Sequence, residues 1–318
     1  MSNNKWCLFF MPIWPPGHTI PMVEAAKRLL QCNSTSSNSL SITFLLMQTP
    51  TADSMSSITE SYLRSVDSLN FPINFQQLPV VKPPAQFDDP EEFITIYVKL
   101  HLPHVKDAIA TSGSRVAALV LDPFATSLID LGNELNIPCY IFHTSNAAFL
   151  SLVLHLPILD EKIKQEFSEI DGPIKVPGVS PVPSHFMPPI LMNKKSGAYK
   201  SFLYLGRRYM EAKGIIVNSS IALEERVLKA VEQGQCAPDK PAPAIYPIGP
   251  IVSIPKVGPE QHECVKWLDL QQPKSVMFLC FGSRGGFELP QIKEMAIGLE
   301  RSGHRFLWAI RAPCTGIK

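Results

Sequence analysis

Two residues suited to proton transfer stand at the ends of two predicted strands. His18 follows the apolar strand 5–13 and a Pro-Pro-Gly turn, in the first turn of the helix that leads into "IPMVEAAKRLL". Asp122 closes the apolar strand "RVAALVLD" at 115–122. In open parallel sheets, ligands bind outside the carboxyl ends of the strands. If these two strands are neighbours, both turns reach the same edge of the sheet.

The chemistry expected of this pair is general base catalysis. A helix N-terminus disfavours the imidazolium form, so we expect His18 to be a neutral base near pH 7. A carboxylate on the other ring nitrogen would fix the tautomer and stabilise the imidazolium as a proton arrives. The simpler alternative is that His18 bonds local backbone groups while Asp122 caps the next helix. Because the simpler role is the more common one for an isolated His and Asp, the residues alone leave both roles open.

A glycine-rich turn supplies a second candidate site. "FGSRGG" follows a predicted strand and precedes a helix, so Gly282, Gly285 and Gly286 would let backbone N–H groups approach an anion. Ser283 would add a hydroxyl donor. The turn matches neither a dinucleotide fingerprint nor a Walker loop, so an oxidoreductase is not supported. Phe281 stands where a nucleophile elbow has its first Gly, which argues against a serine hydrolase.

Aromatic side chains gather near the predicted strand ends, namely Trp14, Phe124, Phe142, Phe149 and Phe202. At least half of such residues belong to a hydrophobic core. The others are candidates to line a flat apolar pocket for an acceptor molecule.

The elements that position these residues alternate between strands and helices. Further continuous apolar strands are expected at 40–49, 138–145 and 213–220, with helical patterns between them. This pattern predicts an α/β fold whose parallel sheet is covered on both faces. The stretch 157–196 is less regular, which in an α/β domain favours a functional loop region.

Seven prolines between 238 and 259 mark the expected domain boundary. We therefore expect a Rossmann-like domain at 1–237, a Pro-rich linker at 238–262 and a second unit at 263–318. That second unit holds one βαβ pattern, which cannot bury a core of its own, so it is expected to be incomplete.

Composition excludes several classes of partner. The 318 residues carry 29 Lys and Arg against 28 Asp and Glu, a balance that argues against nucleic acid or an anionic membrane. No stretch reaches the roughly 18 apolar residues of a spanning helix. The seven cysteines are scattered and form no C-x-x-C pair, so we interpret them as reduced thiols in a cytoplasmic protein, without a metal site.

Several segments, in order, resemble the landmarks of the plant UDP-glycosyltransferases, an inverting family with the two-Rossmann GT-B fold. They are "PPGHTIPMVEAAKRL", "LVLDPFATSLIDLGNELNIPCYIFHTSNAAFL", "GIIVNSSIALE", "YPIGPIV" and the stretch from Cys264 to Arg311. The sequence is most similar to the branch that glucosylates flavonoids, anthocyanidins and related small molecules.

This resemblance implies a role for each matched residue. His18 would be the general base and Asp122 its orienting partner. Thr144 would lie near the donor sugar, and Gly282 with Ser283 near the diphosphate. Trp14, Phe124, Phe149 and Phe202 would contact the acceptor. The co-substrate would be a UDP-sugar, with no metal and no other cofactor, and we expect a monomer.

Three departures from the family pattern shape the functional expectation. Arg284 stands in the phosphate turn, and the final "CTGIK" follows no family motif. The donor-binding signature that begins W-A-P-Q is absent from the 318 residues. We therefore expect a C-terminally truncated glucosyltransferase with impaired turnover. The alternative is a non-catalytic product, either an acceptor-binding module or an unstable fragment.

Overall fold

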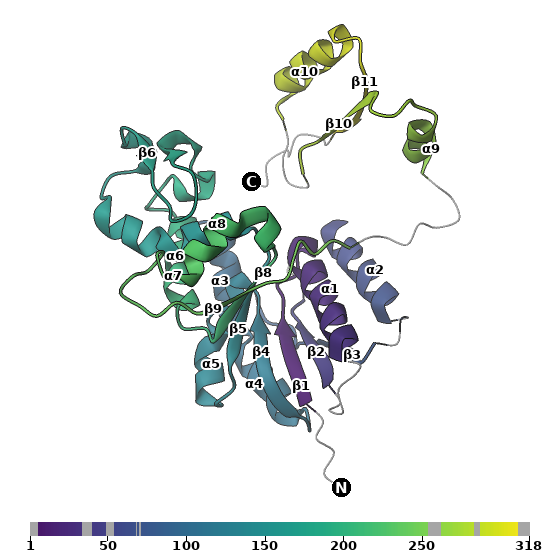
Figure 1. Cartoon of the computed structure of the whole chain (residues 1–318). Helices are drawn as coiled ribbons and strands as arrows, with labels where there is room; N and C mark the ends of the chain where they lie inside the picture. Colours follow the sequence, from purple (N-terminus) through teal and green to yellow (C-terminus); the bar gives the residue numbers. More distant parts are fainter. Residues whose placement is uncertain are drawn as a thin grey trace. The chain divides into compact units, whose positions relative to one another are not determined.

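The computed structural model describes residues 6–33, 40–48, 54–67, 69, 71–253, 262–282 and 287–310. The chain divides into two units, 1–253 and 254–318. Figure 1 shows the elements of both.

A seven-stranded parallel sheet forms the centre of the first unit, in the order β3-β2-β1-β4-β5-β8-β9. Its strands are β1 (Trp6–Met11), β2 (Leu40–Leu46), β3 (Ile73–Gln77), β4 (Arg115–Leu121), β5 (Cys139–His143), β8 (Gly214–Val217) and β9 (Ala244–Pro247). The α/β fold predicted from the alternating apolar runs is thus confirmed.

Helices cover the two faces of the sheet unequally (Figure 1). On one face, α1 (Pro16–Asn33) and α2 (Ser54–Asp67) contribute to a core that includes Phe10 and Phe142. The larger core lies on the other face. It is built by α3 (Pro90–Leu100), α4 (Leu102–Thr111), α5 (Leu128–Glu134), α6 (Ala147–Lys162), α7 (Gly197–Tyr209) and α8 (Ile221–Glu232).

The irregular stretch expected at 157–196 is made of short pieces. After α6 ends at Lys162, a two-stranded antiparallel ladder, β6 (Pro173–Ile174) with β7 (Val182–Pro183), alternates with 3-10 turns at Phe167–Glu169, Ser184–Phe186 and Pro189–Leu191. Ser184 and Leu191 are buried, so this region packs as part of the domain.

The Pro-rich segment expected to be a linker contributes β9 to the sheet. This strand pairs with β8 from Gly214 to Val217, and the first unit extends to Ser253. Proline tolerates a sheet edge because its missing N–H is not needed there. The second unit contains α9 (Glu263–Asp269), β10 (Val276–Cys280), α10 (Leu289–Arg301) and β11 (Arg305–Ala309), with β10 and β11 parallel.

Gly206 lets α7 approach α6 closely. A Cβ added at Gly206 would lie 2.3 Å from the carbonyl oxygen of Val153 in α6, which is too short for any side-chain carbon. We expect Gly206→Ala to destabilise the first unit by about 1–3 kcal/mol, because the two helices must separate. Urea unfolding measures this change in the free energy of unfolding. Gly298→Ala, where an added Cβ meets nothing within 4 Å, is the control and should cause no loss. Equal stability of Gly206→Ala and the wild type would contradict the packing argument.

Candidate active site

The structure brings His18 and Asp122 into direct contact. His18 is the third residue of α1, and Asp122 directly follows β4. Because β1 pairs with β4 up to Met11 and Leu121, both residues leave the sheet at the same edge. His18 Nδ1 lies 2.7 Å from Asp122 Oδ2, and the exposed fractions of the two side chains are 23% and 0%.

Asp122 makes the contacts expected for both of the roles that the sequence left open. Its Oδ1 accepts a 3.0 Å hydrogen bond from the N–H of Phe124, which caps the short 3-10 helix Pro123–Ala125, while Oδ2 bonds His18. Its backbone N–H donates to the carbonyl of Met11, which ties the turn to β1. Since a carboxylate only accepts hydrogen bonds, the proton of a neutral His18 ring sits on Nδ1, and Nε2 keeps its lone pair.

Three of the four predicted acceptor-binding aromatics form a series that begins at His18. The ring centroids of His18 and Phe124 are 6.0 Å apart, those of Phe124 and Phe202 5.9 Å, and those of Phe202 and Phe149 5.7 Å. Trp14 instead packs edge-on against Phe93 and Tyr97 of α3. Phe142, also considered from the sequence, is buried in the core beneath α1.

His143, which the sequence analysis did not single out, is buried beside this series. It ends β5, stacks on Phe149 at 6.1 Å and meets Tyr209 edge-on at 6.1 Å. Among the residues that the structure describes, neither of its ring nitrogens has a partner at hydrogen-bond geometry. Burial lowers the pKa of His143 to about 4, outweighing the opposing effects of the Asn146 backbone and the Glu224 carboxylate. The sequence feature that could have pointed to His143 is its position directly before the predicted donor-side residue Thr144.

The predicted donor-side residues fall in both units. Thr144 directly follows β5 at the edge that carries His18, and its carbonyl accepts a bond from Asn218 Nδ2 at 3.4 Å. Gly282 follows β10 in the second unit, where its φ of +82° is one that glycine adopts without strain. Ser283 and Arg284 lie outside the described residues.

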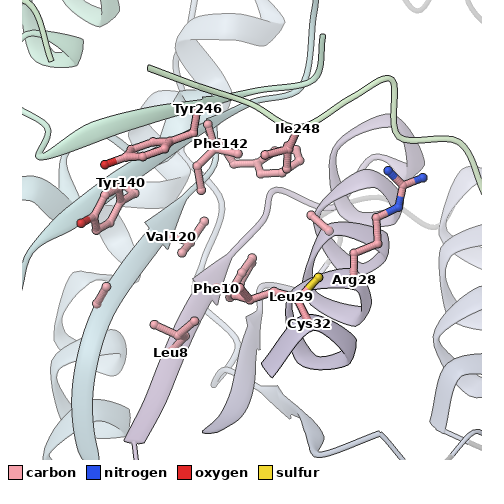
Figure 2. Close-up of a pocket in the computed structure, with 13 residues that line it drawn as sticks. Leu8, Phe10, Arg28, Leu29, Cys32, Val120, Tyr140, Phe142, Tyr246 and Ile248 are labelled. Atoms are coloured by element: carbon pink, nitrogen blue, oxygen red, sulfur yellow. The ribbon is translucent and has the colours of Figure 1, made fainter. Parts of the chain in front are cut away.

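An apolar trough of about 610 Å³ lies on the α1 side of the sheet (Figure 2). Its floor includes Leu8, Phe10 and Val120, and among the described residues that line it only Arg28 of α1 is charged. Phe142, one of the aromatics considered from the sequence, lines this trough, whereas His18, Asp122, Thr144 and the aromatics Trp14, Phe124, Phe149 and Phe202 are not among its lining residues. The trough is therefore separate from the His18 site.

In the described ranges, no group of three or more His, Cys, Asp and Glu side chains is arranged to hold a metal. Within the same ranges, every helix is too short or too polar to cross a bilayer.

The fold and the site define an α/β protein with a histidine–carboxylate pair at the carboxyl edge of a parallel sheet. No family model matches the chain. Individual proteins do match it. Malvidin galactosylase UGT88C3 of Oryza sativa subsp. japonica is 45% identical over 305 residues, which cover 95% of this chain and 63% of that protein. The anthocyanidin 5,3-O-glucosyltransferase of a Rosa hybrid cultivar is 37% identical, covering 93% of this chain and 64% of that protein.

Solved structures give the same result. A UDP-glucosyltransferase from Polygonum tinctorium capable of glucosylating indoxyl superposes with a TM-score of 0.83 at 36% identity, covering 99% of this chain and 67% of that chain. Medicago truncatula UGT71G1, solved with UDP-glucose, superposes with a TM-score of 0.81 at 36% identity, covering 98% and 68% of the two chains. The chain belongs to the plant UDP-glycosyltransferase family. It spans 63% to 64% of the length of the first curated relatives that it matches.

The burial of His143 predicts a specific pH dependence of stability. Its pKa in the folded state is about 4, below the unfolded value near 6.5, so the unfolded state binds the proton more tightly. The contribution of the neutral His143 ring to the free energy of unfolding is fully present above pH 6.5 and is lost as the pH falls toward 4. From pH 7 to pH 5 we expect the free energy of unfolding of the wild type to fall by about 2 kcal/mol more than that of His143→Phe.

Urea unfolding followed by circular dichroism at both pH values measures the difference. His185→Gln is the control, because His185 is exposed and its replacement should leave the pH dependence unchanged. An equal fall in the wild type and in His143→Phe would contradict the placement of a neutral imidazole in this core.

Proposed function

We propose that this chain carries the acceptor half of a UDP-sugar-dependent O-glucosyltransferase acting on flavonoids or related phenols. One observation carries the proposal. His18, at the carboxyl edge of the sheet, is held by a fully buried carboxylate at 2.7 Å while part of its side chain remains exposed. The relatives' names support the acceptor class, since they include an anthocyanidin 5,3-O-glucosyltransferase and a flavonol 3-O-glucosyltransferase.

The proposed reaction begins with proton transfer. Nε2 of His18 takes the proton of the acceptor hydroxyl as the oxygen attacks the anomeric carbon of the donor sugar. The bond from that carbon to the diphosphate breaks, UDP leaves with the electron pair, and an α-linked donor yields a β-glucoside. Phenols have pKa values near 10 and imidazole near 6.5, so the transfer must accompany the attack. Asp122 stabilises the imidazolium that forms.

The remaining predicted residues divide between acceptor and donor. Phe124, Phe149 and Phe202 offer apolar surface to a flat acceptor. Trp14, which packs against Phe93 and Tyr97 of α3, is proposed to contact the same acceptor. Thr144 contacts the donor sugar, and Gly282 with Ser283 contact the diphosphate. No metal is needed, because the base and the leaving nucleotide supply the chemistry. We further propose a cytoplasmic monomer, in keeping with the thiol form of all six described cysteines.

Transfer activity tests this assignment. Incubating the chain with UDP-glucose and a flavonol panel, followed by mass spectrometry, should yield glucoside at a rate well below that of a full-length relative. The reason is that the residues that bind uracil and ribose in the family are not among the 318. We expect His18→Ala to lower this rate by a factor on the order of 100 or more, the usual effect of removing a general base.

Asp122→Asn should lower the rate by at least about tenfold, because the amide can donate to Nδ1 and so move the ring proton to Nε2. Asp171→Asn is the matched control, an exposed carboxylate without an assigned role. Turnover at the level of a full-length relative would contradict the impaired donor side. Turnover unaffected by His18→Ala would contradict the base.

A second candidate function for these 318 residues is acceptor binding without catalysis, because His18 and the aromatic series of Phe124, Phe149 and Phe202 all lie in the first unit. Calorimetry distinguishes the two candidates. Acceptor binding without catalysis predicts flavonol binding without UDP-glucose binding and without any glucoside. Detectable glucoside that depends on His18 would contradict it.

A further inference from the structure

The first turn of α6 is held by a side chain from a distant part of the sequence. Glu224, 77 residues after Ala147, accepts the N–H of Ala147 on Oε2 at 2.8 Å and the N–H of Ala148 on Oε1 at 2.9 Å. Asn146 caps the third position by accepting the N–H of Phe149 at 2.9 Å. The N–H groups of the first three residues of α6, which the helix itself leaves unpaired, are therefore occupied here by protein.

Glu224 is constrained from its own side as well. Its backbone departs from helical geometry within α8, with φ −136° and ψ 40°, and Ser219 donates its hydroxyl to Oε2. The hydrogen bonds from Ser219, Ala147 and Ala148 lower its pKa despite the opposing effect of burial. No Lys or Arg in the described part of the chain pairs with it, so the positive end of the α6 dipole supplies the compensating charge.

The segment that Glu224 holds carries residues of the proposed site. Phe149 is the third residue of α6, and its ring lies between Phe202 and the buried His143. Asn218, which follows β8, bonds the segment just before α6. Its backbone N–H donates to the carbonyl of His143 and its side-chain amide donates to the carbonyl of Thr144. The orientation of this turn thus sets where the Phe149 ring stands.

We propose that Glu224 is a positioning residue of the acceptor site: by clamping the first turn of α6, it holds the Phe149 ring in place for a flat aromatic acceptor. The inference rests on the proposed function, since Phe149 contacts an acceptor only if this aromatic series is the acceptor site. It also means that the α6 N-terminus is not free to bind the donor's diphosphate, because its amides already bond a carboxylate.

Flavonol affinity and amide exchange together test the clamp. The Kd for one flavonol is measured by fluorescence quenching at a temperature below the unfolding transition of every variant. Hydrogen exchange is followed at the backbone amides of Ala147 and Ala148. Glu224→Ala should weaken binding by a factor on the order of ten and speed exchange at both amides by at least as much. Glu224→Gln keeps an acceptor oxygen, so its flavonol affinity and its amide exchange rates should fall between those of Glu224→Ala and the wild type.

Two controls separate positioning from stability. Glu225→Ala removes the neighbouring exposed carboxylate, which pairs with Lys229, and should bind as the wild type does. Val227→Ala weakens the buried face of the same helix without touching the clamp. A loss of affinity in Val227→Ala equal to that in Glu224→Ala would reduce Glu224 to a structural residue and overturn the inference.

The outcomes also separate this inference from the proposed function. Wild-type affinity in Glu224→Ala, or unchanged exchange at Ala147 and Ala148, would overturn the role of Glu224 alone. A wild-type chain that binds no flavonol would refute the acceptor site itself, and the positioning role with it.

Discussion

The contact between the buried Asp122 carboxylate and His18 Nδ1 is the interaction on which the proposed chemistry depends. A carboxylate removed from water must be compensated, and here the compensation comes from the imidazole and the N–H of Phe124. The same two bonds fix the direction of the ring and leave Nε2 as its basic atom. Parallel pairing of β1 with β4 makes the contact possible, because it brings the two strand ends together.

Around this pair, hydrogen bonds from other elements hold the two turns that carry the site at the carboxyl edge of the sheet. The turn after β4 is tied to β1, and the turn after β5 is tied to α8 through Glu224 and to the end of β8 through Asn218. The aromatic series runs between these two turns. In the described part of the chain, the buried imidazole of His143 has no partner at hydrogen-bond geometry. Its burial weakens the fold in acid and leaves an uncharged ring beneath Phe149.

The sequence alone predicted the strands that carry the site, because β1, β4, β5 and β8 are largely apolar on both faces and appear as continuous apolar runs. It placed His18 and Asp122 at the same edge of the sheet on the condition that their strands are neighbours, and it left their roles open. The edge strand β3, with its sequence "INFQQ", lacks that apolar signal and was missed. Glu224 and Asn218 were missed for a different reason: their bonds join segments more than 70 residues apart, and nothing local distinguishes them from solvated polar residues.

The tautomer of His18 tests the central contact most directly. Nitrogen NMR of the histidine-labelled chain, with His18 assigned by its loss in His18→Gln, reports which ring nitrogen carries the proton in the neutral form. We expect the proton on Nδ1 in the wild type and on Nε2 once Asp122 is replaced by Asn. A wild-type ring protonated on Nε2, or a tautomer indifferent to that replacement, would show that the carboxylate does not orient the base.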